Sequence, residues 1–267
     1  MRLALRHASG HGTPILFIHG SFEDHHGWAP VVRELGHTVD NPTLVYDRRG
    51  HSASTDVDGQ GHLAHDVDDA IALLNARCPG AVHVVGHAYG ASIAIALAHR
   101  SPALVRSAFL YEPPLFGLLG ASPRDAALLT GVKAAIARAA GLIRDGALEL
   151  GTAHFFDRVA LGDGAWARLS PATQARMLLN ADTWIDQSKD PQRLEIDFLH
   201  LVPLGARVSL VSGSASLPTF RRVSRIMHVG LAEAHAVVLA GAGHAAPNSH
   251  PRAFAAALAQ HLDRNDA

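Results

Sequence analysis

The chain of 267 residues has very little cysteine and almost no excess of one charge. Cys78 is its single cysteine, so no disulfide can form within the chain. The formal net charge of −1 provides no large field of one sign, so we expect neither nucleic acid nor an anionic membrane as a partner. We find no continuous run of about 18 apolar residues. The start at Met1 has no apolar signal segment either. These features predict a cytoplasmic protein without a membrane-spanning helix.

Histidine, by contrast, is abundant, with 19 residues spread along the chain. His25 and His26 are adjacent, but a metal centre needs further ligands at defined geometry, and the sequence offers none that is evident. We therefore expect no metal and no cofactor.

Nearly half of the residues are hydrophobic (48%), enough for one domain with a large core. Apolar runs alternate with segments that have apolar residues at helical spacing, a pattern that predicts parallel βαβ units and the α/β class. The expected strands lie at residues 3–5, 14–18, 43–46, 82–85, 105–111, 207–211 and 236–239. The expected helices of this part lie at residues 28–35, 62–76, 89–99 and 251–262.

The middle of the chain follows a different pattern, because residues 113–203 contain helical stretches and no clear strand. The predicted helices are 124–144, 147–159 and 171–188, the last with Ser170 as its N-cap. We interpret this block as a helical cap inserted into a core made of residues 1–112 and 204–267. Ligands of open α/β sheets bind at the carboxyl ends of the strands, where such a cap would lie.

One predicted strand-to-helix junction carries a glycine-bounded motif, Gly86-x-Ala88-x-Gly90. The pattern G-x-S-x-G forms a strained turn that exposes a nucleophile, and its glycines allow the backbones to approach closely. The motif resembles that of the serine-hydrolase branch of the α/β-hydrolase superfamily, with alanine in place of the nucleophile. The resemblance implies an α/β-hydrolase fold with a mostly parallel sheet flanked by helices.

Two further segments extend this resemblance. Residues 17–22 follow a buried strand and match the HG-x loop of the family, which implies that the backbone N–H groups of Ser21 and Tyr89 form an oxyanion hole. Residues 46–52 match the family's D-x-R-G-x-[GS] loop, which we interpret as structural, with Asp47 and Arg49 bracing neighbouring loops.

The base and the acid of a catalytic triad are also suggested by position. His244 lies in a G-x-G-H loop after the last strand and resembles the family's catalytic histidine. Many relatives carry the acid after the strand that follows the cap, but residues 211–218 contain no carboxylate. Glu112 ends the strand before the cap, and the order Ala88, Glu112, His244 fits nucleophile, acid, base.

Three explanations of Ala88 are open. The chain can be an inactivated variant of a serine enzyme, the reading that we favour because Glu112, His244 and both glycines are retained. The natural residue could instead be aspartate, as in epoxide hydrolases and dehalogenases of this fold. A third reading is a natural non-hydrolytic relative that uses the cavity for ligand binding or proton transfer.

The substrate depends on the cap. Apolar residues are expected to line the cleft, which favours a small hydrophobic, uncharged ester or lactone as the partner. The expected substrate contacts are Phe22, Leu115, Phe116 and Trp184. The chain is loosely similar to fungal zearalenone lactonases, which place a Glu-Pro pair before the cap, as Glu112 and Pro113 do here, and a tryptophan late in it, as Trp184 is. A homodimer is left open.

Overall fold

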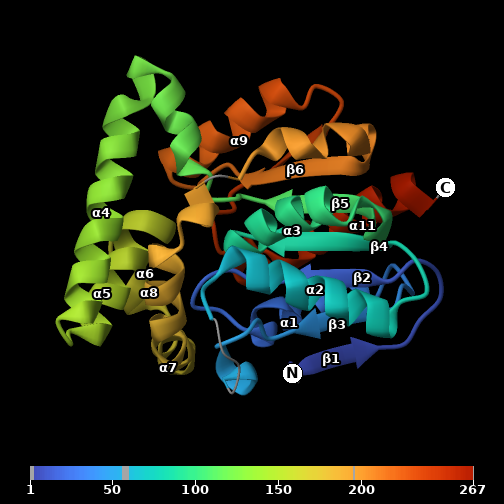
Figure 1. Ribbon diagram of the computed structural model, residues 1–267, viewed down its shortest axis with the longest axis horizontal. Helices are drawn as coiled ribbons and strands as arrows, with labels where there is room; N and C mark the ends of the chain where they lie inside the picture. Colours follow the sequence, from blue (N-terminus) through green and yellow to red (C-terminus); the bar gives the residue numbers. More distant parts are fainter. Residues whose placement is uncertain (1–2, 56–59, 195, 267) are drawn as a thin grey trace.

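The computed structural model describes residues 3–55, 60–194 and 196–266. Within them, seven strands form one sheet in the order β1-β3-β2-β4-β5-β6-β7. All neighbours are parallel except β1, which pairs antiparallel with β3 (Figure 1). The predicted α/β class with a mostly parallel sheet is confirmed. The strands are β1 (Leu5–Ala8), β2 (Ile15–Ile18), β3 (Thr43–Tyr46), β4 (Val82–His87), β5 (Val105–Tyr111), β6 (Val208–Gly213) and β7 (His235–Leu239).

Helices cover both faces of this sheet, and for that reason its central strands are apolar on both sides. One face carries α2 (Leu63–Arg77), α3 (Tyr89–Arg100) and α9 (Pro218–Gly230), and the other carries α1 (Ala29–Leu35) and α11 (Pro251–Asp266). Helix α9 was missed in the sequence, although its buried residues Phe220, Val223 and Met227 recur at helical spacing. Short helices complete the core: η1 (His25–Trp28), η2 (Ser52–Ser54), η3 (Pro102–Leu104) and α10 (Ala246–Ser249).

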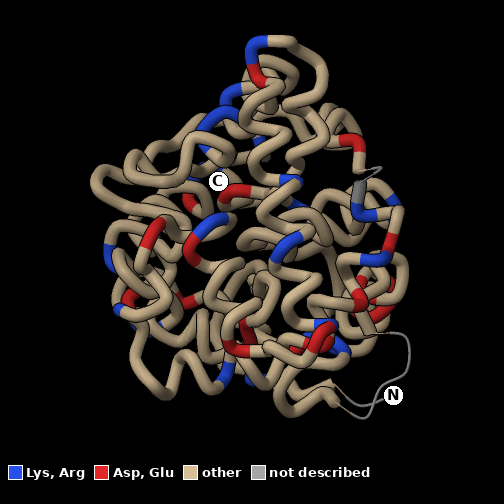
Figure 2. Tube along the Cα trace, turned by 90° about the vertical axis from the view of Figure 1, so that its left-hand side faces the viewer, with Lys and Arg blue, Asp and Glu red and all other residues tan. Residues whose placement is uncertain are grey.

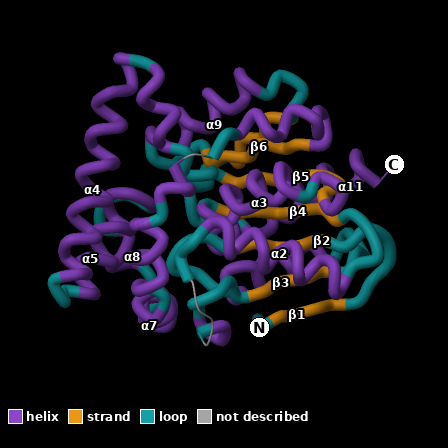
Figure 3. The backbone as a smooth tube through the Cα atoms, viewed as in Figure 1, coloured by secondary structure: helices purple, strands orange, loops and turns teal. Residues whose placement is uncertain are grey.

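Between β5 and β6 the described residues form helices and no strand. Figures 1 and 3 show α4 to α8 gathered beyond the ends toward which the parallel strands run. The boundaries predicted for the cap, residues 113 and 203, fall just after β5 and inside η8. The helices are η4 (Phe116–Ala121), η5 (Pro123–Asp125), α4 (Ala126–Arg144), α5 (Leu148–Phe155), η6 (Phe156–Ala160), α6 (Ala165–Arg168), α7 (Pro171–Leu179), α8 (Ala181–Lys189), η7 (Pro191–Leu194) and η8 (Phe198–Arg207).

The predicted single helix at residues 171–188 is wrong, because the structure divides it into α7 and α8 at Asn180. The Asn180 side chain donates to the carbonyl oxygens of Phe22 and Glu23 and accepts from the Ser52 N–H. These bonds tie the helical segment to the loops of the sheet. The predicted N-cap at the start of α7 is confirmed, since Ser170 Oγ accepts from the Thr173 N–H at 3.2 Å.

Residues 123–144, which comprise η5 and α4, are long and apolar enough to cross a membrane by length and composition alone. The expectation that no such stretch exists is therefore corrected. The many alanines, leucines and isoleucines of this segment outweigh its few charges. Only 22% of its most apolar window is buried in the structure, and one such helix is weak evidence for a membrane.

Along the chain trace, basic and acidic residues are interspersed on the side of the molecule that carries the helical segment (Figure 2). This distribution matches the near-zero net charge of the sequence.

Candidate active site

The turn between β4 and α3 has the backbone geometry of an exposed elbow. Ala88 has φ 50° and ψ −122°, a strained conformation for a residue other than glycine, and its N–H donates to the Tyr111 carbonyl oxygen at 2.9 Å. A methyl group at Gly86 would overlap Ala91, and one at Gly90 would overlap the Ile18 carbonyl. The flanking glycines are therefore required by close backbone contacts, and they hold the Ala88 methyl at the wall of a cavity.

The loop after β2 approaches this elbow closely, since a methyl at Gly20 would lie 3.0 Å from the Ala88 Cβ. Ser21 and Tyr89 both line the cavity. Among the hydrogen bonds of the described residues, none uses the backbone N–H of either one. Ser21 and Tyr89 thus lie with Ala88 at one cavity, and their N–H groups have no partner among the described residues.

The predicted acid and base are in direct contact. His244 Nδ1 lies 2.7 Å from Glu112 Oε2, and the other carboxylate oxygen accepts from the Gly213 N–H at 2.8 Å. Glu112 is fully buried and His244 reaches the cavity. The segment that lacks the more usual acid therefore supplies a backbone donor to Glu112 instead. Because Nδ1 faces a carboxylate, it carries the hydrogen, and Nε2 is the nitrogen left to act on a ligand.

The environment of this pair favours a neutral imidazole beside a carboxylate. Burial lowers the pKa of His244 below 6.5, although Glu112 opposes that effect. Burial alone would raise the pKa of Glu112, but the bonds from His244 and Gly213 outweigh it and lower that pKa below 4.5. The Phe220 ring stacks on the imidazole with centroids 3.9 Å apart and so limits its rotation. A neutral, oriented imidazole is the form that a general base requires.

A second histidine–carboxylate pair lies beside the elbow and was missed in the sequence. His87 Nδ1 lies 2.9 Å from Glu23 Oε2, and His87 Nε2 lies 2.9 Å from the His244 carbonyl oxygen. Both partners accept hydrogen bonds, so both ring nitrogens must donate and the ring is an imidazolium. Glu23 Oε2 also accepts from the Gly20 N–H. One partly buried ion pair therefore links the Ser21 loop, the elbow and the His244 loop. Nothing in the local sequence marks Glu23 for this role.

The loop after β3 is braced as its motif suggested. Asp47 accepts from the N–H groups of His25 and Ala53, and Arg49 forms a two-bond ion pair with Asp69 of α2. Its neighbour Arg48 is completely buried and pairs with Asp66 of α2 at 3.0 Å.

The cavity has a volume of about 200 Å³, and its walls are mainly apolar. Of the predicted substrate contacts, Phe22, Phe116 and Trp184 line it. Leu115 does not line the cavity. Its side chain is buried instead in the hydrophobic core that includes residues of α2, α3 and α9. The predicted contact at Leu115 is therefore wrong. Aromatic rings from the helical segment form much of the wall, with Phe155 and Trp184 each about 5 Å from Phe22.

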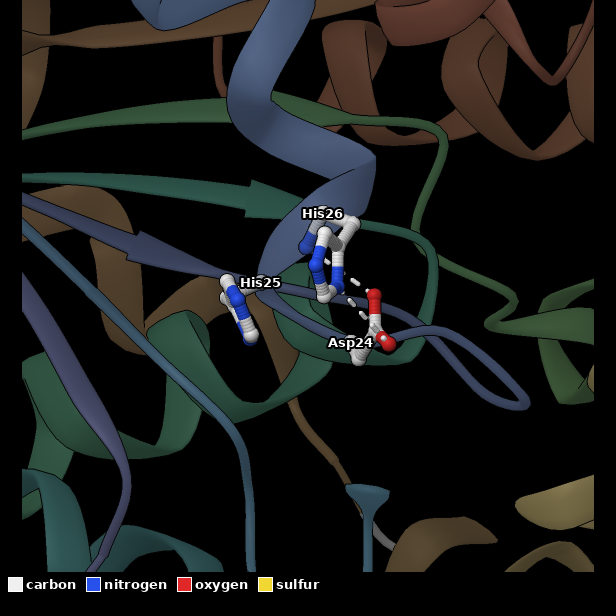
Figure 4. Close-up of side chains that lie close together, drawn as sticks. All are labelled: Asp24, His25 and His26. Atoms are coloured by element: carbon white, nitrogen blue, oxygen red, sulfur yellow. Dashed lines mark hydrogen bonds and ion pairs between the residues drawn. The ribbon is translucent and has the colours of Figure 1, made fainter. Parts of the chain in front are cut away.

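Asp24, His25 and His26 carry potential metal-ligand atoms within 4.8 Å of one another, and Figure 4 shows His26 directed toward Asp24. Each group already has a partner. Asp24 accepts from the His26 N–H and from Ser52 Oγ, and His25 Nδ1 bonds Asp47 at 2.7 Å. We interpret these contacts as a cap on η1 rather than as a metal centre.

Comparison with known proteins gives matches across the chain. The model of the alpha/beta hydrolase family matches residues 15–257. The chain is 33% identical over 99 residues to 2-(acetamidomethylene)succinate hydrolase of Mesorhizobium japonicum. That alignment covers 37% of this chain and 34% of the relative, so it spans about a third of the relative's length.

Two solved structures are similar over nearly their whole lengths. A thermophilic esterase from Thermogutta terrifontis has a TM-score of 0.75 and 19% identity, covering 99% of this chain and 94% of that one. The enol-lactonase from Burkholderia xenovorans has a TM-score of 0.72 and 18% identity, covering 98% and 96%. At these identities the likeness supports the fold alone.

Proposed function

Because this chain belongs to the alpha/beta hydrolase family, we propose that its cavity binds a small hydrophobic ester or lactone with the carbonyl carbon against Ala88. The observation that carries the proposal is a convergence at this one residue. Ala88, His244, Ser21 and Tyr89 all line one cavity, and no hydrogen bond among the described residues uses the N–H of Ser21 or Tyr89. Behind the imidazole, Glu112 binds Nδ1. This is the arrangement of an acyl-transfer site.

The mechanism follows for a chain in which position 88 is serine. His244 Nε2 removes the hydroxyl proton while the oxygen attacks the ester carbonyl, and the carbonyl oxygen becomes an oxyanion between the two N–H groups. The imidazolium then gives its proton to the leaving alkoxide, which leaves an acyl-enzyme. Water attacks that acyl group with the same base and releases the acid. Glu112 stabilises the imidazolium at each step.

The chain with Ala88 has no oxygen at this position and cannot form the acyl-enzyme. Loss of a triad serine typically lowers kcat by about a million-fold. We therefore propose that the Ala88 form binds the substrate and leaves it almost intact. That serine is the natural residue stays a hypothesis. It is supported by the retention of the Glu112–His244 pair and of Gly86 and Gly90.

The substrate class is supported by the walls of the cavity. Pockets with mainly apolar walls and a few directed polar groups favour uncharged, hydrophobic ligands. Two structural neighbours are an esterase and an enol-lactonase, which is in keeping with ester or lactone chemistry. The similarity to zearalenone lactonases stays a prediction, and with it the contact of Trp184 with substrate.

The test is the variant Ala88→Ser, assayed with p-nitrophenyl esters of increasing chain length and with aryl lactones. We expect hydrolysis at least about a thousand-fold faster than with the Ala88 chain, since the oxyanion hole and binding alone leave only a small residual rate. Addition of His244→Ala to the serine form should abolish the gain. No gain on any member of the panel would contradict the proposal.

A parallel variant separates the aspartate alternative. Ala88→Asp that opens epoxides or displaces halide, with the serine variant inert, would assign the site to that chemistry instead. Catalysis of proton exchange at a ketone by the Ala88 chain, lost in His244→Ala, would favour the non-hydrolytic reading.

A further inference from the structure

The peptide group between Gly20 and Ser21 is held at its carbonyl end by two donors. The Gly20 carbonyl oxygen lies 3.1 Å from Arg48 Nη2 and 2.9 Å from His19 Nδ1. The C=O and N–H of a planar trans peptide point in opposite directions. Fixing this carbonyl oxygen therefore fixes the direction of the Ser21 N–H, which is one of the two free amides at the cavity.

The direction of each bond in this network follows from its partners. His19 Nε2 accepts from the Arg48 backbone N–H at 3.0 Å, so the hydrogen of the neutral ring must lie on Nδ1, facing the Gly20 oxygen. Burial lowers the pKa of His19 well below 6.5, which agrees with a neutral ring. His51 behaves in the same way: Nδ1 faces the Arg49 carbonyl oxygen at 3.0 Å, and Nε2 accepts from Arg48 at 3.1 Å.

Arg48 cannot easily adopt another position. Its side chain is completely buried, and Nη1 bonds Asp66 of α2 at 3.0 Å. The guanidinium is planar, so the bonds to Asp66 and Gly20 together set its orientation. A positive charge at the carbonyl end of a peptide also polarises that peptide and makes its N–H a stronger donor.

We propose that Arg48 is a positioning residue of the oxyanion hole, which holds the Gly20 carbonyl so that the Ser21 N–H faces the reacting carbonyl group of the substrate. This role rests on the proposed function, because it supposes an oxyanion at that amide. It extends the role of Arg48 alone from bracing a loop to orienting the hole, and it leaves Arg49 as a structural brace.

The adjacent arginine provides a matched control. Arg49 also pairs with an aspartate of α2, through Nε and Nη2 to Asp69 at 2.7 and 2.6 Å. In both ion pairs an arginine of the loop after β3 binds an aspartate of α2, and all four residues are buried. Arg49 binds Asp69 through both Nε and Nη2. Removing the Arg49 side chain should therefore disturb the loop without releasing the Gly20 carbonyl.

The kinetic experiment uses the Ala88→Ser background with either pair neutralised, Arg48→Met with Asp66→Asn or Arg49→Met with Asp69→Asn. Removing both partners avoids an unpaired buried carboxylate. Loss of an oxyanion donor lowers kcat by about a hundred- to a thousand-fold, and a misdirected donor should cost at least about tenfold with little change in KM. The Arg49 pair should keep kcat within about threefold. Equal losses in both variants, or unchanged kcat in a folded Arg48 variant, would overturn the proposal.

A spectroscopic measurement on the Ala88 chain needs no turnover. In an assigned amide NMR spectrum, neutralising the Arg48 pair should move the Ser21 N–H resonance and speed its exchange with solvent, whereas neutralising the Arg49 pair should leave it in place. Arg48→Lys, which keeps the charge but loses the fork, should give a smaller shift. An unchanged Ser21 resonance would refute the positioning role even if the serine variant hydrolyses esters. A moved resonance with an inert serine variant would instead sink only the proposed function.

Discussion

The two sides of the cavity are built on different principles. The side formed by the loops of the sheet is polar and held by bonds of fixed direction, such as those that His244 donates to Glu112 and His87 donates to Glu23. The side formed by the helical segment is mainly apolar, and its aromatic rings Phe155 and Trp184 pack against Phe22 from the loop after β2. Directed bonds fix positions to fractions of an ångström, whereas apolar contact scales with area and tolerates changes of shape. The first side should therefore control kcat and the second KM.

The largest effect is expected on the polar side, from Glu112→Gln in the Ala88→Ser background. A neutral amide cannot stabilise the imidazolium and allows the wrong tautomer of His244, so kcat should fall by about a thousand-fold or more. Steady-state ester hydrolysis measures this. Glu149→Gln on the exposed face of α5 serves as the control and should not change the rate. A loss confined to KM would contradict the assignment of Glu112 as the acid.

The close packing of the polar side should appear in stability. A methyl at Gly90 would overlap the backbone of Ile18, so Gly90→Ala should lower the free energy of unfolding by about 1–3 kcal/mol. Gly131 in α4 is exposed with open space around it, and there the same substitution should stabilise by about 0.5–1 kcal/mol through helix propensity. Urea unfolding of the two variants tests the contrast. Similar values for both would mean that the elbow is looser than its backbone contacts imply.

Two adjacent residues sharpen the comparison on the apolar side. Phe116 lines the cavity, whereas Leu115 is buried in the core. In the serine background, Phe116→Leu should raise KM for an aryl ester by severalfold, roughly the 1 kcal/mol of the lost contact area, and leave kcat nearly unchanged. Leu115→Ala should instead destabilise the fold by about 2–3 kcal/mol and leave KM unchanged. The reverse result would place the substrate elsewhere.

The sequence predicted what depends on order along the chain. The alternation of strands and helices gave the sheet, and the glycines of the elbow with Glu112 and His244 could be located because each follows a predicted strand. The sequence did not reveal contacts between segments distant in the chain. Asn180 interrupts a regular helical pattern because its amide bonds loops near Phe22, and Glu23 owes its role to an imidazole 64 residues away. Such contacts leave no local periodicity to detect.

The smallest effect we predict concerns the ion pair that links the loops of the polar side. Burial alone would lower the pKa of His87, but Glu23 and the His244 carbonyl oxygen outweigh it and raise that pKa above 6.5. Burial would likewise raise the pKa of Glu23, but His87 and the Gly20 N–H lower it from 4.5 to about 2. Glu112 lies near His87 and favours its charged form, whereas His19, which lies near Glu23, is neutral.

The raised pKa of His87 contributes stability that is complete below 6.5 and is lost as the pH rises through the folded-state value. The lowered pKa of Glu23 contributes stability that is complete above 4.5 and is lost as the pH falls toward about 2. The free energy of unfolding should therefore be higher for the Ala88 chain than for its His87→Gln variant. This difference should be largest between pH 4.5 and 6.5 and should shrink on either side. Urea unfolding of both chains over a series of pH values measures this difference. Because glutamine can still donate a hydrogen bond but cannot carry the charge, a difference independent of pH would show that His87 is neutral. One of its two acceptors would then lack a donor.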